Sequence, residues 1–406
     1  MKKAIRSFLL SETTYSVLIS GLLLCIPLRY AFSSIAVIVL TAVSFFSVFF
    51  HKPEFKKAYW PPILLYALML LSLLWSVEVQ KSLRGLERQL PFLIMPLAFW
   101  MMPKLSRTVF MKILWAFSAG LALMALVLIG YSASLYVQGR TFGVFQYHFL
   151  VSPLDLNAIY VSVMVSLSFL FMIFYGKRKL LNYGIIVVLG LFLWLLSSKN
   201  IILITSAALF FGVLLRGKYS SKQFMVLITA VAVVGALVLY SPVKRRWNNE
   251  RHSDFKEALT AQSFGILYPW TGTSLRVFQG RMFYELLQEN DTWLTGFGVN
   301  AAQDKLAEQQ NRYNVYCGYN EYNFHNQYLQ TFAELGIFGF LIVCGMLLLL
   351  FQNYRKQKEL MALFLGLVLF SIFLTETYIW RQRGMIHFLV LFLLLFKIIP
   401  SQKTAL

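Results

Sequence analysis

The sequence predicts an all-α polytopic membrane protein, and two observations predict this fold class. Of the 406 residues, 58% are hydrophobic and only 13% are charged, whereas a soluble domain of this size needs more polar surface to cover its core. Apolar runs long enough to cross ~30 Å of hydrocarbon also recur along the whole chain. Inside lipid such runs must be helical, because a helix satisfies its own backbone hydrogen bonds.

The apolar runs give about twelve transmembrane helices of the length that a bilayer requires. They lie near 13–28, 31–50, 60–76, 89–103, 108–130, 157–175, 183–197, 200–215, 224–241, 336–353, 359–377 and 385–399. One long segment separates the ninth span from the tenth. The chain is therefore expected to have three parts, namely spans one to nine (1–241), a large loop (242–335) and spans ten to twelve (336–406).

Short basic clusters in the loops predict the orientation of these spans. With this span count, every cluster falls on the side of the N-terminus: Lys2/Lys3/Arg6, Lys52/Lys56/Lys57, Lys104/Arg107, Lys177/Arg178/Lys179, Arg216/Lys218/Lys222 and Arg355/Lys356/Lys358. The positive-inside rule puts both termini and these loops in the cytoplasm. The large loop then lies on the outer side of the membrane, and its mixture of apolar and charged residues over 274–290 predicts that it is partly helical.

The net charge of +20 does not predict a nucleic-acid partner, since most Lys and Arg residues stand in the short loops that set topology. Membrane lipids are the expected surroundings instead. The three cysteines are scattered, and no paired-cysteine spacing, phosphate-binding glycine loop or acidic cluster for Mg²⁺ is visible in the sequence. We therefore expect no cofactor and no metal.

His325 is the first candidate for chemistry. It stands at the start of a stretch with helical apolar spacing, and Asn323 is predicted to be the N-cap of that helix. For a histidine in the first turn, the positive end of the helix dipole disfavours the protonated form, so the imidazole stays neutral, as a general base requires. The alternative is a histidine whose hydrogen bonds are satisfied at a membrane interface. His252, the other histidine of the large loop, stands in a charged stretch typical of solvated surface.

Two arginines of the large loop, Arg276 and Arg281, are candidates for binding phosphate. The guanidinium fork suits phosphate oxygens and stays charged. The alternative for both is a solvated helix face or contact with anionic lipid. Because five residues separate them, they lie on different faces of an ideal helix and need not share one ligand.

Lys199 and Arg88 are two further candidate cations. Lys199 lies at the turn between two apolar runs with no acid nearby in sequence. A cation at membrane depth is costly and often functional, although a lysine there can also snorkel to the interface. Arg88 lies in another predicted outer loop, where Glu87 is a possible partner. Glu376, Arg381 and Arg383 bracket the last outer turn, and their role stays open.

Several of these strings together resemble the O-antigen ligase and polymerase superfamily. Phe324-His325-Asn326-Gln327-Tyr328-Leu329-Gln330, followed by Glu334-Leu335-Gly336-Ile337-Phe338-Gly339, is similar to the family's outer His-Asn pair and the Glu-x-Gly-x-x-Gly pattern after it. Arg276 with Gly296-Phe297-Gly298 resembles the family's upstream Arg and Gly-x-Gly turn. The run from Leu73 to Pro91, which contains Arg88, resembles its early outer loop. One departure is Ser198-Lys199, where the family usually has Ser-Arg.

The resemblance implies a GT-C-like, metal-independent glycosyltransferase whose active site faces the periplasm. Its donor would be a glycan on undecaprenyl diphosphate, and its acceptor a sugar hydroxyl, on lipid A-core for a ligase. The resemblance implies catalytic roles for His325 and Arg276, and substrate binding by Lys199, Arg88, Arg281 and Asn326. We favour a ligase. A polymerase that extends a lipid-linked glycan, as in O-antigen or capsule, is the alternative within the family, and a transporter or flippase of lipid-linked sugars is the alternative from another class.

Overall fold

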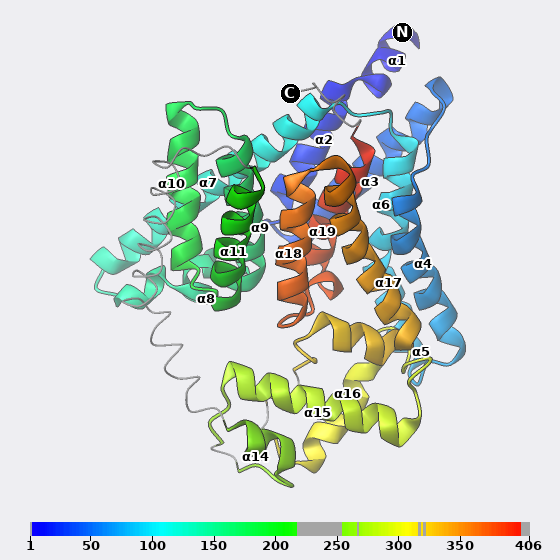
Figure 1. Cartoon of the computed structure of the whole chain (residues 1–406), viewed down its shortest axis with the longest axis vertical. Coiled ribbons are helices and arrows are strands. Elements are labelled where there is room, and N and C mark those ends of the chain that lie inside the picture. Colours follow the sequence, from blue (N-terminus) through cyan, green and yellow to red (C-terminus); the bar gives the residue numbers. More distant parts are fainter. Residues whose placement is uncertain (1, 217–253, 266–267, 316–317, 320–321, 399–406) are drawn as a thin grey trace.

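The chain is all-helical in the part that the structure describes. The computed structural model describes residues 2–216, 254–265, 268–315, 318–319 and 322–398. These residues form helices and loops, with one isolated β-bridge between Leu105 and Ile398 (Figure 1). The prediction of an all-α fold is confirmed for them. The predicted ninth span (224–241), the start of the predicted large loop, and Lys218, Lys222, His252, Cys317 and Glu321 lie outside the described residues.

Most helices belong to one bundle. Its first half consists of α1 (Lys2–Leu10), α2 (Glu12–Cys25), α3 (Tyr30–Ser47), α4 (Trp60–Leu71), α5 (Val79–Gln89), α6 (Pro91–Met101) and α7 (Arg107–Val137). The second half consists of α8 (Tyr147–Val151), α9 (Ala158–Tyr175), α10 (Leu180–Leu195), α11 (Lys199–Arg216), α17 (Gln327–Gln357), α18 (Leu360–Phe373) and α19 (Gln382–Lys397). Short 3₁₀ turns occupy Val48–Phe50, Lys57–Tyr59, Ser72–Leu74, Phe142–Phe145, Ser152–Leu154 and Tyr378–Trp380.

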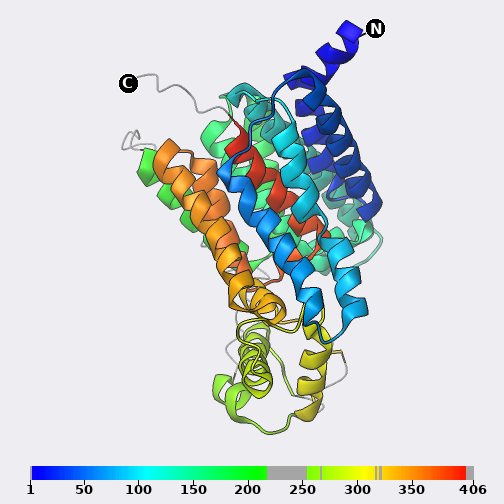
Figure 2. The same cartoon turned by 90° about the vertical axis from the view of Figure 1, so that its right-hand side faces the viewer.

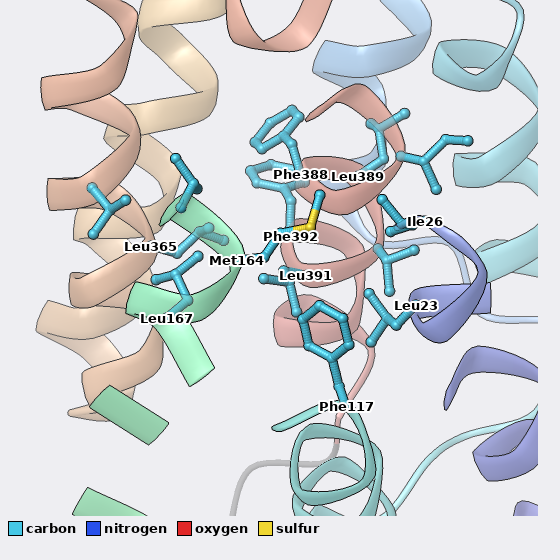
Figure 3. Close-up of a cluster of buried hydrophobic side chains, with 14 of the residues drawn as sticks. Leu23, Ile26, Phe117, Met164, Leu167, Leu365, Phe388, Leu389, Leu391 and Phe392 are labelled. Atoms are coloured by element: carbon cyan, nitrogen blue, oxygen red, sulfur yellow. The ribbon is translucent and has the colours of Figure 1, made fainter. Parts of the chain in front are cut away.

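Helix α19 forms the centre of the bundle. Every residue from Arg383 to Leu395 is buried, as expected for a helix that is apolar on nearly all sides. Figure 2 shows α19 between the N-terminal helices and the α17–α18 pair. Phe388 and Phe392 of α19 pack among side chains of other helices, including Leu23 of α2, Phe117 of α7 and Met164 of α9 (Figure 3).

Each predicted span except 224–241 coincides with a helix of the structure. Among the described helices, six are long and apolar enough to cross a membrane, and the pair α1 and α2, bent by 55°, gives a seventh if it crosses as one span. Helices such as α10 and α18 are apolar but shorter. The chain is therefore a membrane protein, while the count of twelve crossings stays a prediction.

The structure gathers the predicted cytoplasmic loops at one end of the bundle. Lys104 pairs with Glu54 at 3.1 Å, and Arg107 Nη1 lies 2.6 Å from Glu359 Oε2. Arg216 Nη1 donates to the carbonyl oxygen of Phe174 at 2.5 Å. Loops that the sequence assigned to one side therefore contact each other, which is required of any correct topology.

Labelling of single cysteines tests the predicted orientation of the protein in the membrane. In a variant without the native cysteines, Glu308→Cys should react with an impermeant maleimide in cells whose outer membrane is permeabilised, because α16 (Ala302–Arg312) belongs to the loop that is predicted to be periplasmic. Arg178→Cys should react only after the inner membrane is opened. The opposite pattern would contradict the orientation and, with it, a periplasmic active site.

Three helices, α14 (Phe255–Thr260), α15 (Gly272–Asn290) and α16 (Ala302–Arg312), form a separate unit at the other end of the bundle (Figure 1). This outer unit has its own apolar cluster, in which Phe264, Phe278 and Met282 are buried. Asp254 caps α14, and Thr271 and Ser274 form a capping box at the start of α15. The outer unit leads into α17, whose first turns join it to the bundle.

Helix α17 kinks at Gly336, the residue at which the tenth span was predicted to begin. Gly336 has φ +64° and ψ −163°, which is not helical. The actual helix begins nine residues earlier, at Gln327, because the turns before the kink pack in the outer unit. A Cβ built on Gly336 would lie 2.0 Å from the carbonyl oxygen of Leu294. Only glycine satisfies both the backbone conformation and this close approach.

Replacing Gly336 by alanine should destabilise the protein. The positive φ alone costs ~1–3 kcal/mol, and the contact with Leu294 adds to it. A thermal melt of the purified protein in detergent should show a clear loss of stability. Gly345→Ala, on the same helix and with nothing within 4 Å of its Cβ position, is the matched control and should melt like the wild type or slightly higher. Equal melting of both variants would contradict the account.

Candidate active site

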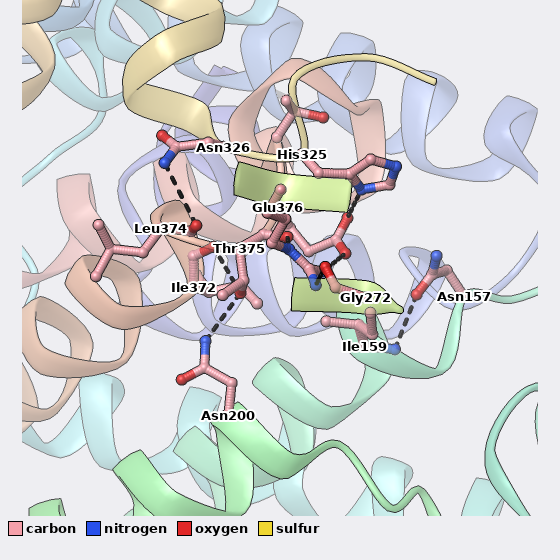
Figure 4. Close-up of polar contacts among 12 residues, drawn as sticks. Asn157, Ile159, Asn200, Gly272, His325, Asn326, Ile372, Leu374, Thr375 and Glu376 are labelled. Atoms are coloured by element: carbon pink, nitrogen blue, oxygen red, sulfur yellow. Dashed lines mark hydrogen bonds and ion pairs between the residues drawn. The ribbon is translucent and has the colours of Figure 1, made fainter. Parts of the chain in front are cut away.

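The outer turn between α18 and α19 is held by side chains from distant elements. Asn326 Nδ2 donates to the carbonyl oxygen of Leu374 at 3.3 Å (Figure 4). Asn323 Nδ2 donates to Thr377 Oγ1 at 2.9 Å. The Tyr160 hydroxyl of α9 donates to the carbonyl oxygen of Thr377 at 3.0 Å. These contacts fix the backbone on both sides of Glu376.

Glu376 lies between Arg276 and His325 and is in contact with both. Its Oε1 is 3.3 Å from Arg276 Nη2. Its Oε2 is 3.5 Å from His325 Nδ1, and Figure 4 shows these two side chains facing each other. The Glu376 side chain is only 9% exposed. A nearly buried carboxylate requires compensating partners, and an arginine and a histidine supply them here. The structure thus brings together the two residues predicted to be catalytic, with an acid between them whose role the sequence left open.

His325 precedes the helix and does not begin it. Its φ is +46°, and its backbone N–H donates to Asn323 Oδ1 at 2.9 Å. The N-cap of α17 is Asn326, whose Oδ1 accepts from Leu329 N at 3.1 Å. The predicted cap at Asn323 and the placement of His325 in the first helical turn are therefore wrong. Asn323 instead forms a local turn with the His325 backbone, which is a common alternative use of an asparagine side chain.

The position of Glu376 favours one tautomer of neutral His325. A proton on Nδ1 faces the carboxylate, which leaves the lone pair of Nε2 available to accept a proton. The separation of 3.5 Å is longer than a formed hydrogen bond. Catalytic hydrogen bonds are often long in the absence of substrate and tighten when it binds. The Tyr322 ring lies edge-on to the imidazole, with the two centroids 5.1 Å apart, and limits its rotation.

Arg276 is held by three acceptors at once. Besides Glu376, Nε donates to the carbonyl oxygen of Thr375 at 3.0 Å and Nη1 donates to that of Gly272 at 2.8 Å. A guanidinium has five N–H groups, so within the described part of the chain two of them remain to bind a ligand. Arg276 is thus oriented before any ligand arrives, and its side chain is 30% exposed.

A pocket of about 560 Å³ opens in front of this cluster. Arg276, His325 and Glu376 line it together with Lys199, the first residue of α11, and His148 of α8. Two permanent cations against one carboxylate give the pocket a positive balance, which favours an anionic ligand. The pocket volume lies within the ~300–1,000 Å³ that is typical of ligand sites.

A second pocket of about 380 Å³ shares His325 and Glu376 with the first. Arg381 and Arg383 line only this second pocket. Arg383 is 8% exposed and donates to the carbonyl oxygens of Asp155 and Leu28. Asp155 and Glu376 balance these two arginines in the second pocket, so His325 and Glu376 lie where a basic pocket meets one whose charges balance.

Arg281 and Arg88 line neither of these two pockets. Arg281 Nε is 2.7 Å from Glu285 Oε1, and its guanidinium stacks on Tyr313 at 4.4 Å. Burial raises the pKa of the Glu285 carboxyl, but hydrogen bonds from Gln309, Arg281 and Tyr313 outweigh this and hold it below its ordinary value. Arg281 thus stabilises the outer unit, and Arg88 is exposed on α5. The predicted separation of Arg276 and Arg281 onto different faces of one helix agrees with these contacts.

Asn326 and the glycine motifs form the scaffold of the site. Asn326 caps α17 and donates to the outer turn, and it does not line either pocket. Phe297 N donates to the carbonyl oxygen of Ala333 at 2.8 Å, and Gly298 N to that of Glu334 at 2.9 Å. The buried Glu334 carboxylate accepts from Trp380 Nε1 at 2.9 Å and from Asn300 N at 2.6 Å. The Gly-x-Gly turn at 296–298 thereby joins the outer unit to α17, and Glu334 joins α17 to the outer turn that carries Glu376.

His148 is a pocket residue that the sequence did not single out. Its Nδ1 accepts from Ala158 N at 3.3 Å, so the neutral ring carries its proton on Nε2. His148 is 177 positions away from His325 along the chain, and no local pattern surrounds it. The sequence indicated a function for Glu376 and Arg383 only weakly, through the general rule that charged residues beside apolar spans are costly and often functional.

Comparison with known proteins supports a family. Residues 184–344 match the family model described as O-Antigen ligase, which confirms the resemblance to the O-antigen ligase superfamily. The matched segment includes Lys199, Arg276 and His325. No curated protein matches the chain. The family match supports glycan transfer of the O-antigen ligase or polymerase kind in general.

Proposed function

We propose that this chain, which carries a domain of the O-antigen ligase superfamily, moves a glycan from undecaprenyl diphosphate to a sugar hydroxyl at the periplasmic face of the inner membrane. The observation that carries the proposal is the contact of one buried acid, Glu376, with both His325 and Arg276 at the wall of a basic pocket. This arrangement combines a base, a residue that orients it and a fixed cation. Transfer of a sugar from a diphosphate requires each of these.

His325 is the proposed general base. The acceptor hydroxyl oxygen attacks the anomeric carbon of the donor sugar while its proton passes to His325 Nε2. The bond between the anomeric carbon and the diphosphate oxygen breaks, and its electron pair leaves with the carrier diphosphate. Glu376 stabilises the imidazolium that forms, as a carboxylate behind a catalytic histidine does in hydrolases.

Arg276 is proposed to stabilise the leaving diphosphate. Three contacts fix its guanidinium, so little reorganisation is required when negative charge develops on the leaving group. Lys199 lines the same pocket and would add charge without a bidentate fork. The acceptor would occupy the neighbouring pocket beside Arg381 and Arg383, since His325 faces both pockets. Asn326 would act through the outer turn rather than through the substrate.

Lys199→Arg tests the proposed role of the pocket cations. Arginine is the usual residue of the family at this position, and its fork can bind two phosphate oxygens. We expect turnover equal to or higher than that of the wild type, and tighter donor binding, in a titration with carrier-linked donor. Lys199→Gln should weaken donor binding. If Lys199→Arg loses activity, Lys199 does not bind the diphosphate as proposed.

Deletion of the chain from its host distinguishes the candidate functions. A ligase predicts that long glycan chains disappear from lipid A-core while the donor accumulates on its carrier at the periplasmic face. A polymerase predicts that single repeat units remain on lipid A-core. A flippase predicts that the donor accumulates at the cytoplasmic face. The proposal of a ligase is contradicted by either of the last two results, and glycan transfer as such is contradicted by the last.

A further inference from the structure

A third cavity lies at the opposite end of the bundle from Glu376. It has a volume of about 840 Å³ and opens between α2, the first turns of α7, and the connection from α9 to α10. Thr108 and Lys112 of α7 line it, whereas the outer turn with Glu376 lies near the other end of the bundle. None of its lining residues belongs to the two pockets described above.

The mouth of this cavity is basic. Lys112, Lys177 and Lys179 line it and are exposed, and its lining residues include no Asp or Glu. Glu359, which accepts from the lining residue Tyr175, does not line the cavity and is paired with Arg107. Asn182 at the same level accepts from Trp115 Nε1 at 2.9 Å and donates to the carbonyl oxygen of Lys177 at 2.8 Å. These two bonds fix the loop that carries two of the lysines. An anion at the mouth would therefore meet three cations and no competing carboxylate.

The wall of the cavity is mostly apolar, and it also carries the hydroxyl groups of Ser16, Ser20, Thr108 and Tyr175. Val17, Leu24, Met111 and Phe171 line it. Ser20, also on the wall, is only 7% exposed, and within the described part of the chain its Oγ has no hydrogen-bond partner. A buried polar group without a partner is destabilising, so a ligand that supplies an acceptor or donor at this depth would be stabilised by it.

We infer that this cavity binds an anionic phospholipid of the adjacent membrane leaflet. The phosphate would lie among the three lysines, a glycerol or ester oxygen would reach Ser20, and an acyl chain would follow the apolar wall. Basic pockets between membrane helices bind anionic headgroups, and each lysine near the surface contributes ~5-fold in affinity. The cavity thus combines cations, hydroxyl groups and an apolar wall, which match the phosphate, the ester oxygens and the acyl chain of a phospholipid.

Native mass spectrometry of the purified full-length protein tests the inference. After delipidation, phosphatidylglycerol and phosphatidylcholine with the same acyl chains are titrated separately. The wild type should bind one phosphatidylglycerol at least ~10-fold more tightly than phosphatidylcholine. The triple variant Lys112→Gln, Lys177→Gln, Lys179→Gln should lose that preference. The control triple variant Arg355→Gln, Lys356→Gln, Lys358→Gln removes the same charge elsewhere and should keep it.

Gly21→Leu tests the cavity without changing its charge. Gly21 lines the cavity, and a Cβ built there has nothing within 4 Å, so a leucine has room and also favours the helix. We expect it to weaken phosphatidylglycerol binding several-fold while the melting temperature is unchanged or higher. Gly345→Leu, at another glycine with open space around it, should bind like the wild type.

Three outcomes would overturn the inference. They are equal affinity of the wild type for both phospholipids, an unchanged preference in the lysine triple variant, and unchanged binding in Gly21→Leu. Undecaprenyl phosphate is added at equal concentration as a competitor. If it displaces phosphatidylglycerol stoichiometrically, the occupant is the isoprenoid carrier and not a phospholipid.

Discussion

His325→Ala should lower the turnover number of glycan transfer by about 10²–10⁴-fold, which is the usual contribution of a positioned general base. Donor affinity should change little, because the diphosphate is expected to bind at Arg276 and Lys199, and Arg276 contacts a different oxygen of Glu376 than His325 does. The measurement is transfer from purified carrier-linked donor to acceptor under single-turnover conditions, with donor binding followed separately. Loss of donor affinity without loss of turnover would contradict the role of a base.

His325→Gln separates proton transfer from hydrogen bonding. The amide can hydrogen-bond the acceptor but cannot take its proton, so turnover should be as low as in His325→Ala. Near-wild-type turnover would mean that His325 only orients the acceptor, and Glu321 and Glu376 would then be the first candidates for the base. His252→Ala is the control on the predicted large loop. His252 lies outside the described residues, and its charged sequence context predicts a nearly silent change.

Arg276→Ala should reduce transfer by ~10²–10³-fold or more, the range found when a fixed donor to developing negative charge is removed. The variant also leaves Glu376 without its cationic partner beside His325. Arg276→Lys should recover part of the activity, because lysine keeps the charge but cannot reproduce three oriented N–H contacts. Kinetics with purified, monodisperse protein measure both effects. Full activity of Arg276→Ala would exclude Arg276 from the site.

Arg281→Ala is the matched control on the same helix. Arg281 contacts Glu285, Tyr313 and the backbone of Ala261, away from the pocket. We therefore expect a lower melting temperature with little change in turnover per folded molecule. The opposite behaviour of two arginines five residues apart would be hard to explain by a general loss of charge in the outer unit. Equal catalytic loss in both variants would contradict the assignment of distinct roles.

The positions of most helices could be predicted from the sequence, because a bilayer requires long apolar runs and basic loops at one side. The pairing of Lys104 with Glu54 and of Arg107 with Glu359 agrees with that assignment. The central position of α19 could not be predicted, since α18 and α19 are both apolar by sequence. Packing against neighbours decides which of them is buried on all sides.

The candidate site was predictable only where a local motif carried it. His325 and Arg276 stand in recognisable strings, but Glu376 is 51 positions beyond His325 and 100 beyond Arg276. Only the tertiary fold brings this acid between them. The wrong N-cap has a local cause, because Asn323 and Asn326 are both good caps by residue type. The turn at His325 uses the Asn323 side chain and leaves Asn326 as the cap of α17, and the sequence does not reveal this turn.

Release of the carrier, measured together with glycan transfer in a purified system, tests the central claim most directly. The reaction contains the detergent-purified chain, an undecaprenyl-diphosphate-linked glycan, lipid A-core acceptor and a metal chelator. We expect one undecaprenyl diphosphate to be released for each glycan transferred, in the wild type but not in His325→Ala or Arg276→Ala. Release of carrier without formation of glycosylated acceptor, or transfer that survives in both variants, would contradict the proposed active site.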